Sequence, residues 1–264
     1  MIRSALMNVM TAAVLKAGRG LKRDLGEVEN LQVSVKGPGD FVTAADRRSE
    51  RTLFEELSRV RPGYGFVMEE SGRHEGSDRS HTWHVDPLDG TTNFLHGIPI
   101  FAISVGLERE GQLVAGVVYN PATDDMYFAE RGQGAYHNNR RLRVAARRDI
   151  GEALVTCGIP ALGRAQLHPR FKAEMGEVMA RAGVLRRFGA AALDLASVAA
   201  GSSDAYWERG VRSWDVAAGT VLVREAGGFV SSADAGEDVI GAGTILAGNE
   251  YMHRTMLEIL RRAR

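Results

Sequence analysis

The chain of 264 residues has one cysteine, equal numbers of opposite charges and no long apolar run. A single thiol cannot form an internal disulfide, which excludes the disulfide-stabilised secreted folds. The 33 Lys and Arg residues balance 33 Asp and Glu residues, so we expect no general electrostatic attraction to nucleic acid. No stretch is apolar for long enough to cross a bilayer. We therefore expect a cytoplasmic protein with no membrane partner.

Several catalytic and metal-binding motifs are also missing. The sequence contains no Gly-rich nucleotide loop, no His-Glu-x-x-His pair and no twelve-residue calcium loop. The neighbours of Cys157 include no base, so we expect a buried side chain rather than a nucleophile. His84 and His96 are expected to be packing or surface residues, because the seven histidines show no paired spacing.

The length of the chain is sufficient for one large domain or two small ones. Hydrophobic residues make up 44% of it, and no repeat, low-complexity tract or linker divides it. The segment 140–149 is the candidate boundary between two halves of the chain. We therefore expect one compact unit with an N-terminal half, residues 1–145, and a C-terminal half, residues 146–264.

Along the chain, segments whose apolar residues have helical spacing alternate with segments whose apolar residues have strand spacing. Residues 1–23 have no acidic residue, as in a transit peptide, but their apolar spacing favours a helix packed on a core. We place Leu53, Phe54 and Leu57 on the inner face of a helix at 44–60. Helices are also expected at 171–181, 191–200, 216–226 and 251–261, and strands at 31–35, 64–68, 81–85, 100–107, 114–119, 125–129, 153–157 and 184–188. This alternation predicts an α/β or α+β fold with layered sheets.

The segment Trp83–Phe94 (WHVDPLDGTTNF) holds two carboxylates, Asp86 and Asp89, at the end of an expected strand. Pro87 fixes its own φ and Gly90 allows a close approach of the backbone, so both acids can converge on one point. Mg²⁺ prefers such oxygen ligands, and the N–H groups at the helix start that follows suit a phosphate. The pattern is typical of metal-assisted phosphate-ester hydrolysis, although a β-turn whose Asp side chains cap a helix uses the same residues.

Further acidic positions favour the metal site over an isolated turn. Glu69, beside Glu70, ends an expected buried strand, and Asp46 and Asp215 each stand at an expected helix entry. A carboxylate among apolar residues costs free energy unless it is paired or bound to a metal. Four such clusters are hard to explain as four unrelated helix caps. Together they predict one shared site.

These segments resemble the motifs of the inositol monophosphatase family, in the family's order and over most of the chain. The long signature matches almost residue for residue, and in the second motif the family often has Gly in place of Met68. The four matching segments are 40–46 (DFVTAAD), 68–71 (MEES), 83–94 and 214–219 (WDVAAG), the last continuing to EAGG at 225–228. The four motifs together make the resemblance specific.

The resemblance implies a layered α-β-α-β-α sandwich of the sugar-phosphatase type, a homodimer, a requirement for Mg²⁺ with two or three ions per site, and inhibition by Li⁺. The half 1–145 would hold the metal and phosphate site, and the half 146–264 would complete the substrate site. Asp86 would bridge two ions. Carried over by motif, the metal ligands are Glu69, Asp86, the Leu88 carbonyl, Asp89 and Asp215.

The same resemblance implies catalytic and substrate-binding groups. Thr91, paired with Asp46, would orient and help to deprotonate the attacking water, with Glu69 nearby through a third, weaker metal. Lys36 falls close to a family lysine near that metal, although the loop here is one residue shorter. The residues implied in substrate binding are Leu88, Asp89, Gly90, Thr91, Gly189, Ala190, Ala191, Glu208 and Asp215. The segment 158–160 departs from animal members, so no contact is carried over from it.

The sequence favours one reaction and leaves two alternatives open. Thr92 and Asn93 resemble the inositol branch, since the nucleotide and histidinol phosphate branches usually carry Lys there. We therefore expect a phosphoric monoester hydrolase that acts on a small-molecule phosphate ester, inositol-1-phosphate, through metal-activated water. A fructose-1,6-bisphosphatase or broad sugar phosphatase remains open. So does an additional binding role in an RNA or transcription complex.

Overall fold

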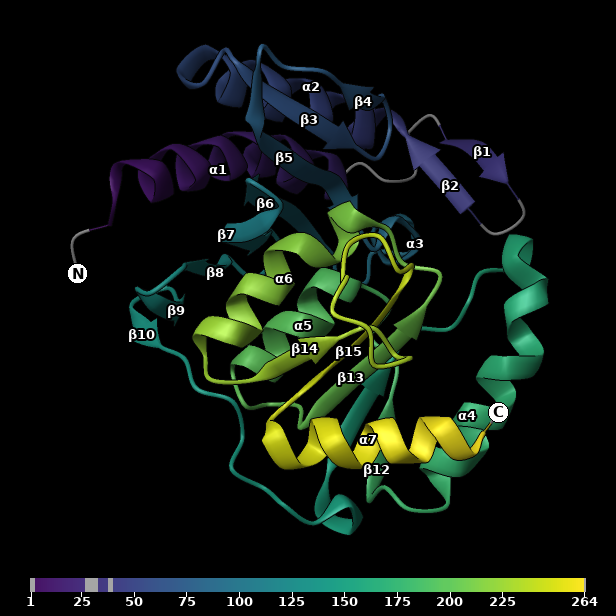
Figure 1. Ribbon diagram of the computed structural model, residues 1–264. Coiled ribbons are helices and arrows are strands. Elements are labelled where there is room, and N and C mark those ends of the chain that lie inside the picture. The colour runs from purple at the N-terminus through teal and green to yellow at the C-terminus, as the bar shows by residue number, and fades with distance from the viewer. Residues whose placement is uncertain (1–2, 27–32, 38–39, 264) are drawn as a thin grey trace.

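The computed structural model describes residues 3–26, 33–37 and 40–263. Strands and helices alternate along this part of the chain (Figure 1). The first elements are α1 (Ala5–Leu25), β1 (Val33–Gly37), β2 (Asp40–Thr43), α2 (Ala44–Val60), β3 (Tyr64–Met68), β4 (Gly72–His74), β5 (Asp78–Asp89), α3 (Thr91–Leu95), β6 (Ala102–Arg109), β7 (Gln112–Asn120), β8 (Asp125–Glu130), β9 (Gly134–His137) and β10 (Arg140–Arg141). They are followed by η2 (Ile150–Glu152), β11 (Leu154–Cys157), η3 (Leu162–Leu167), α4 (His168–Met179), β12 (Val184–Arg186), α5 (Ala191–Ala199), β13 (Ala205–Arg209), α6 (Ser213–Glu225), β14 (Phe229–Ser231), β15 (Thr244–Gly248) and α7 (Glu250–Arg262).

The larger sheet of the described structure has eight strands in the order β10-β9-β8-β7-β6-β5-β3-β4. Its pairs are antiparallel except β3 with β5, which run in parallel with Met68 opposite Val85. These two strands therefore run toward the same edge, and the next residues, Glu69 and Asp86, become neighbours there. Helices α1 and α2 cover one face of this sheet (Figure 1). The parallel pairing of β3 with β5 thus brings two separate acidic segments of the chain together.

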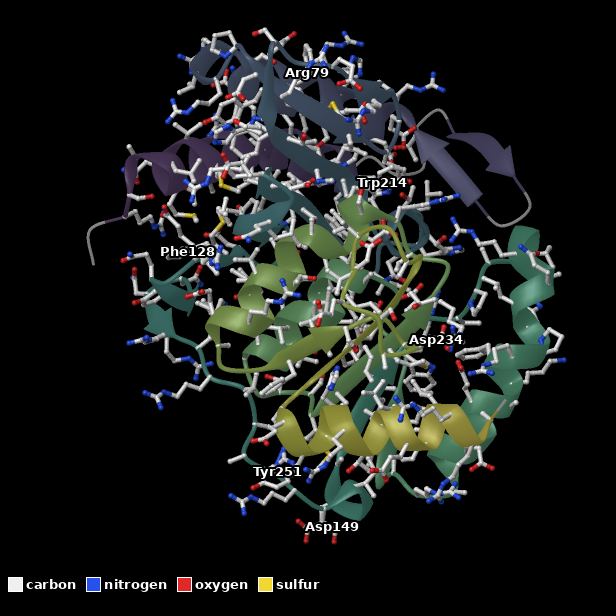
Figure 2. The ribbon with its side chains drawn as sticks, viewed as in Figure 1. Arg79, Phe128, Asp149, Trp214, Asp234 and Tyr251 are labelled. Carbon is white, nitrogen blue, oxygen red and sulfur yellow. The ribbon has the colours of Figure 1, made fainter. Side chains whose placement is uncertain are left out.

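A second sheet of five strands has the order β12-β11-β13-β15-β14. Strand β11 is parallel to both β12 and β13, whereas β15 is antiparallel to both of its neighbours. Helices α5 and α6 lie between the two sheets, and α4 and α7 pack outside the second sheet (Figure 1). Arg79, at the start of β5 in the first sheet, and Asp149, beyond the second sheet, mark opposite ends of the molecule (Figure 2). The order of layers is α-β-α-β-α, as predicted.

Helix α6 lies very close to the larger sheet because two glycines face it. A Cβ atom added to Gly106 in β6 would lie 2.6 Å from the Cβ of Ala217. One added to Gly116 in β7 would lie 2.4 Å from the carbonyl oxygen of Ala218. Any side chain at either glycine would therefore displace the helix. This close packing brings the N-terminal end of α6, where Trp214 lies (Figure 2), toward the end of β5.

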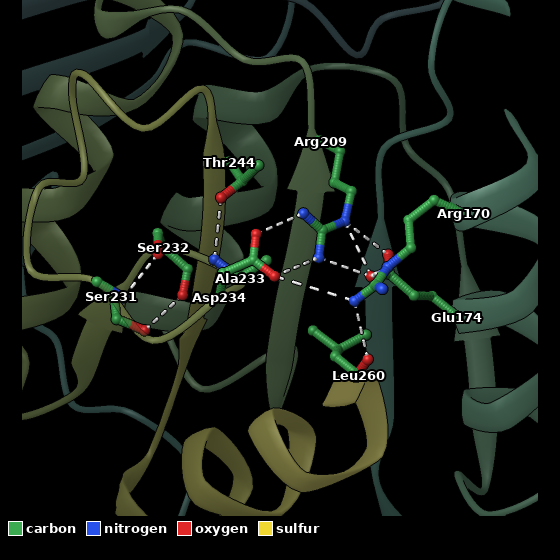
Figure 3. A network of polar contacts seen from close by, with 10 residues as sticks. Arg170, Glu174, Arg209, Ser231, Ser232, Ala233, Asp234, Thr244 and Leu260 are labelled. Atoms are coloured by element: carbon green, nitrogen blue, oxygen red, sulfur yellow. Dashed lines mark hydrogen bonds and ion pairs between the residues drawn. The ribbon is translucent and has the colours of Figure 1, made fainter. Parts of the chain in front are cut away.

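A buried ionic network holds β13 to the outer helical layer (Figure 3). The Nε of Arg209 donates to both carboxylate oxygens of the buried Glu174, at 2.9 and 3.0 Å, and its Nη1 donates to Asp234 at 2.9 Å. Arg170 donates to Glu174 through Nε at 2.7 Å and to the carbonyl oxygen of Leu260 at 3.1 Å. The network joins β13, α4, α7 and the segment after β14, so Arg209 fixes the strand that carries Glu208.

Most predicted elements are confirmed within a few residues, and α2 has the predicted bounds. Strand β5 is longer than predicted, because it continues through Pro87 to Asp89. The prediction for Phe54 was wrong: it is 37% exposed, whereas Leu53 and Leu57 are buried. One residue of an α-helix turns the side chain by about 100°, which places Phe54 at the edge of the inner face, where its ring still packs on Phe66 of β3 with the ring centroids 4.8 Å apart. Leu31, expected to open a strand, lies outside the described residues.

Expectations about inert side chains can also be compared with the structure. Cys157 is buried, as expected, and burial raises the pKa of its thiol to about 12, which disfavours the thiolate that a nucleophile requires. His84 is buried between the Ser213 hydroxyl and the Glu108 carboxylate, each 2.9 Å away, and His96 is exposed. In the described part of the chain, no helix combines the length and apolarity needed to cross a membrane.

Candidate active site

The acidic turn at the end of β5 departs from regular strand pairing. Asp86 pairs with Ser104 of β6 and Asp89 with Ala102, and the register shifts between the two pairs. The backbone N–H of Leu88 donates to the Asp86 carboxylate at 3.0 Å, which fixes the orientation of this side chain. Pro87, which lacks an N–H, stands at the irregularity, where a strand tolerates proline. The bulge thus directs Asp86 and Asp89 to the edge of the sheet.

A cavity of about 160 Å³ opens at this edge. It is lined from both halves of the chain, by β3 and β5, by the start of α3, and by segments of the second sheet and its connections. The lining residues are Glu69, Asp86, Leu88, Asp89, Gly90, Thr91, Gly158, Ile159, Arg187, Gly189, Ala191, Glu208 and Asp215. The structure therefore brings together nearly all of the predicted site residues. Asp46 and Ala190 lie directly behind this lining.

Thr91 and Asp46 form the hydrogen-bonded pair that the resemblance implies. The Thr91 hydroxyl lies 3.1 Å from Asp46 Oδ1 and 3.1 Å from the carbonyl oxygen of Leu88. The other oxygen of Asp46 accepts from the backbone N–H of Thr43 at 2.8 Å, and Thr43 caps α2 in return. This capping box fixes Asp46 as the third residue of α2. Burial raises the pKa of Asp46, against the hydrogen bonds that lower it.

The second half of the chain supplies an acid and a helix N-terminus. Asp215 lies in the first turn of α6, and its Oδ2 accepts from the backbone N–H of Arg212 at 2.7 Å. Oδ2 of Asp89 accepts from the backbone N–H of Ala192 in the first turn of α5, at 2.7 Å. The positive end of α5 therefore faces the cavity and favours anions there. This contact also ties the acidic turn to the second half of the chain.

The carboxylates of the cavity repel one another strongly. Burial, and then the charges of Glu69, Asp89 and Asp215, raise the pKa of Asp86 well above its ordinary value. Burial is also the main cause of the raised pKa of Asp89, and it raises that of Asp215 to about 7. Such a set is costly to hold in the charged form unless a cation enters. The electrostatics of the site therefore favour a positively charged ligand.

The residues present fit Mg²⁺. Among the residues that the structure describes, no three carboxylate, histidine or cysteine side chains are grouped so that they could hold one ion by themselves. Mg²⁺ rarely uses such a group, because it keeps several waters and phosphate oxygens and takes only one or two carboxylates. The donors here are carboxylate and carbonyl oxygens, which suit a hard cation; Asp86 is buried, and Glu69, Asp89 and Asp215 are partly buried. A divalent cation would also offset the repulsion that raises the pKa values of these acids.

Glycines allow two loops to meet beside the acidic turn. Gly90 has φ +88°, and a Cβ added there would lie 3.0 Å from the carbonyl oxygen of Ile100 and 3.3 Å from that of Gly189. Gly90 and Gly189 therefore pack backbone against backbone. The side-chain amide of Asn93 donates hydrogen bonds to both loops, to the carbonyl oxygen of Ile100 at 2.8 Å and to that of Phe188 at 2.9 Å. Together these contacts form one wall of the cavity.

Glu208 occupies the end of the cavity away from Asp86. Its carboxylate accepts a hydrogen bond from the buried Tyr206 hydroxyl, and a Cβ added to Gly158 would lie 1.8 Å from it. Burial raises its pKa, whereas the Tyr206 hydroxyl and the charges of Arg187 and Arg164 lower it. The glycine at position 158 thus makes the space in which Glu208 reaches the cavity. Gly158 and Ile159, in the segment 158–160 from which the resemblance carried over no contact, line the site.

Two features of the site were not predicted. Arg187 lines the cavity, and its only signal in the sequence is its position two residues before Gly189. Ser49, on the buried face of α2, donates to the carbonyl oxygen of Pro87 at 2.8 Å and so holds the acidic turn. No local pattern marks a contact over this sequence distance. The side chain of Lys36 lies outside the described part of the structure.

Comparison with known proteins gives concordant results. A model described as the inositol monophosphatase family matches residues 3–264. An inositol-1-monophosphatase of Mesorhizobium japonicum is 58% identical over 99% of this chain and 98% of its own length. A protein named Nus factor SuhB, of Escherichia coli, is 38% identical over 97% of this chain and 96% of its own. The crystal structure of extragenic suppressor protein suhB from Bartonella henselae is 52% identical, covers 98% of this chain and 99% of its own, and has a TM-score of 0.95.

The layered fold, the acid-lined cavity and these relatives define the class: the protein is a phosphoric monoester hydrolase. The match over nearly the whole chain is decisive for the family. The chain belongs to the inositol monophosphatase family.

Proposed function

We propose that this enzyme hydrolyses small polyol phosphate monoesters with Mg²⁺, and that inositol-1-phosphate is its substrate, converted to inositol and phosphate. The observation that carries the proposal is the convergence of Glu69, Asp86, Asp89 and Asp215 in one cavity with the Thr91–Asp46 pair. These acids come from the residue after β3, from β5 and from α6. The relative named inositol-1-monophosphatase, which is 58% identical, supports the same assignment.

The proposed roles follow from the chemistry of each group. The residues that would hold Mg²⁺, with two or three ions per site, are Glu69, Asp86, the Leu88 carbonyl, Asp89 and Asp215. Bound there, the ions would lower the pKa of a water molecule and stabilise charge on the departing alkoxide. The Thr91 hydroxyl directs its proton to Asp46 or to the Leu88 carbonyl, so its lone pairs can accept from the attacking water and orient it.

The remaining wall of the cavity binds the ester. The backbone N–H groups of Gly90 and Thr91, and the first turn of α5 beyond Gly189–Ala191, face the phosphate. Glu208 accepts hydrogen bonds from polyol hydroxyl groups. Water adds to phosphorus as the ester oxygen leaves, and the alcohol takes up a proton from solvent. The products are the free polyol and inorganic phosphate.

Phosphate release from a panel of esters tests this proposal. The panel holds inositol-1-phosphate, fructose 1,6-bisphosphate, histidinol phosphate and adenosine bisphosphate, each with Mg²⁺, with EDTA, and with Mg²⁺ plus Li⁺. We expect release from inositol-1-phosphate that needs Mg²⁺ and is inhibited by Li⁺. Absence of turnover on every inositol phosphate would remove the substrate assignment, and full activity in EDTA would remove the metal. Release from fructose 1,6-bisphosphate alone would favour a sugar phosphatase instead.

We further propose a homodimer, a cytoplasmic location, and the two-part organisation at residues 1–145 and 146–264. The solution mass measured by light scattering tests the dimer, and a mass equal to that of one chain would contradict it. Expression of the two segments as separate chains tests the two-part organisation. We expect activity only when both segments are present, because each supplies acids to the cavity.

One relative favours a second candidate function. The Escherichia coli protein named Nus factor SuhB is 38% identical over nearly the full length of both chains. A binding role in a transcription complex is therefore the second candidate, carried by the same fold. The variant Asp86→Asn separates the two candidates in the source organism. Loss of the cellular role together with hydrolysis would contradict the binding role, and retention of the cellular role would support it.

A further inference from the structure

A second cavity lies at the end of α6 that is remote from the active site. Its volume is about 410 Å³, and none of its lining residues lines the acid-lined cavity. Helix α6 carries Asp215 in its first turn and Arg224 in its last, so about 14 Å of helix separates the two sites. The turn between β6 and β7, the turn after β8 and the segment 237–240 complete the lining.

Two arginines, Arg131 and Arg224, converge in this second cavity, which we call the arginine cavity. Burial, and then the positive charge of Arg131, lower the pKa of Arg224. A carboxylate beside the guanidinium would raise this pKa instead, and none contributes to the shift. Two like charges therefore face each other without a counter-charge, which favours the entry of an anion.

The donors of the two arginines are largely unused. In the part of the chain that the structure describes, the side chain of Arg224 makes no hydrogen bond and no ion pair. Arg131 donates through Nη1 to the side-chain oxygen of Gln112, and its other N–H groups make no further contact there. Each guanidinium can thus offer the planar fork that binds a phosphate with two parallel hydrogen bonds.

Three acids also line the arginine cavity, but they do not neutralise the arginines. Asp238 accepts through Oδ1 from the backbone N–H of Gly241 at 2.7 Å, so its carboxylate is directed to its own turn. Glu225 is bonded to the turn after β8, and Glu237 is exposed. Within the described ranges, none of the three acids forms an ion pair with either arginine.

The turn that carries Arg131 is fixed before any ligand binds. The carboxylate of Glu225, the last residue of α6, accepts from the backbone N–H groups of Gly132 at 2.9 Å and Gly134 at 2.7 Å. The backbone N–H of Arg131 donates to the carbonyl oxygen of Val114 at 2.8 Å. These contacts hold the turn against the end of α6. A ligand therefore loses little binding free energy to ordering of the backbone.

An apolar wall stands beside the two arginines. Val221 and Val239 are buried, and Leu113 and Ile240 are half-buried, and all four line the arginine cavity. Small-molecule sites typically have a volume of roughly 300–1,000 Å³ and combine apolar walls with a few polar groups. The arginine cavity has this size and this composition.

We propose that the arginine cavity binds a small phosphate monoester with an apolar body, and that Arg131 and Arg224 hold its phosphate. A phosphate monoester carries about 1.5 to 2 negative charges at neutral pH, so it matches two guanidinium groups better than a carboxylate does. The apolar body packs on the wall formed by Leu113, Val221, Val239 and Ile240. This inference goes beyond the proposed hydrolysis, because the site shares no residue with the active site and needs no metal.

Binding measured in EDTA tests the inference, because the acid-lined cavity repels anions when no metal is present. The probe is phenyl phosphate, titrated into the full-length protein by calorimetry, and inorganic phosphate is the comparison that lacks an apolar body. We expect phenyl phosphate to bind with a dissociation constant of about 1 mM or below, and inorganic phosphate to bind roughly tenfold more weakly.

Substitutions assign the binding to one cavity. We expect Arg224→Gln to weaken the binding of phenyl phosphate roughly tenfold or more, because charge-assisted hydrogen bonds are lost. Arg109→Gln is the matched control, since Arg109 is exposed and precedes the turn between β6 and β7 but does not line the arginine cavity. Arg187→Gln removes the cation that lines the acid-lined cavity. Both controls should bind as the wild type does, and melting temperatures establish that all three variants are folded.

Several outcomes would overturn the inference and leave the proposed hydrolysis intact. One is the absence of phenyl phosphate binding to the wild type up to about 10 mM. Another is unchanged affinity in Arg224→Gln. If Arg187→Gln abolishes binding, the probe occupies the active site. If Arg109→Gln weakens binding as much as Arg224→Gln, general surface charge is responsible. Equal affinity for inorganic phosphate would contradict the apolar body of the ligand.

Discussion

Two groups of buried acids in this molecule are stabilised in opposite ways. Glu174, at the outer layer, is fully buried, but Arg209 and Arg170 donate to it, and Asp234 completes the network (Figure 3). In the cavity, Asp86, Asp89 and Asp215 make no ion pair within the described residues, and burial raises the pKa of all three. The first group is complete as folded. The second is completed only by a ligand.

The difference teaches which buried charges serve the fold and which serve the reaction. A paired charge in the interior is needed by its partner, so its loss destabilises the protein. An unpaired charge among like charges destabilises the protein by its presence, so its retention has to be explained by function. Substitutions in the two groups should therefore have opposite effects on stability and on activity.

The largest effect on activity is expected from Asp86→Asn. Loss of this ligand removes several kcal/mol of transition-state stabilisation, so kcat/KM should fall on the order of 10³-fold or more. The same change removes one buried negative charge, so the metal-free protein should unfold at an equal or higher temperature than the wild type. Phosphate release and thermal unfolding in EDTA measure the two effects. A variant that loses activity because it is less stable would contradict the comparison.

The opposite pattern is expected from Arg209→Ala. It leaves Glu174 buried without its main partner, which costs about 3–5 kcal/mol of the free energy of unfolding. Urea unfolding measures this loss, and kcat of the fraction that remains folded should change much less. The double variant Arg209→Met with Glu174→Leu removes both charges and should recover part of the loss. If the double variant is no more stable than Arg209→Ala, the pairing is not the cause.

A smaller effect on activity is expected from Thr91→Ala. The hydroxyl that orients the attacking water is lost, and general-base assistance of this kind contributes about 10²-fold. In the wild type the Thr91 hydroxyl lies 3.1 Å from Asp46. Thr91→Ser keeps a hydroxyl at this position and should retain most of kcat. Affinity for Mg²⁺, measured by calorimetry, should change little in either variant. Equal activity of the two variants would argue against a role for the hydroxyl.

The smallest effect concerns the pH dependence of stability. The pKa of Asp215 is raised from an ordinary value of 3.8 to about 7 because the group is buried. A raised pKa contributes stability that is complete below the unfolded value and is lost as the pH rises through the folded value. The metal-free protein should therefore be less stable at about pH 8 than at about pH 5. Mg²⁺ should raise the melting temperature more at the higher pH, and an equal increase at both would contradict this reasoning.

The local parts of the site could be predicted from the sequence because the chain itself brings them together. One turn contains Asp86, Pro87, Asp89 and Gly90. The chemistry of this turn can be inferred without knowledge of the fold. Long regular elements such as α2 were predicted for the same reason, since their periodicity extends over several turns. The prediction for Phe54 failed at the edge of such a face, where spacing alone does not determine exposure.

The contacts between distant segments could not be derived from spacing. Asp215 reaches the cavity through the packing of α6 between the sheets; its place at a helix entry suggested a shared acidic site, and the resemblance to a family gave its role as a metal ligand. Arg187 carries no local mark of its position. The strands β4, β14 and β15 were not predicted, because three to five residues of mixed character give too short a pattern. Strand β13 was missed because Glu208 and Arg209 interrupt its apolar run.

The packing of α6 on bare glycine backbone fixes the position of the helix that carries Asp215. Gly106 pairs with His84, two residues before Asp86, and Ala217 lies two residues after Asp215. No adjustable side chain separates the helix from the sheet at this point, so the approach of α6 to β6 is fixed by backbone and by the methyl group of Ala217. A methyl group at position 106, far from any reacting atom, would act as a spacer between them. The placement of the acids in the active site therefore depends partly on residues whose side chains carry no functional group.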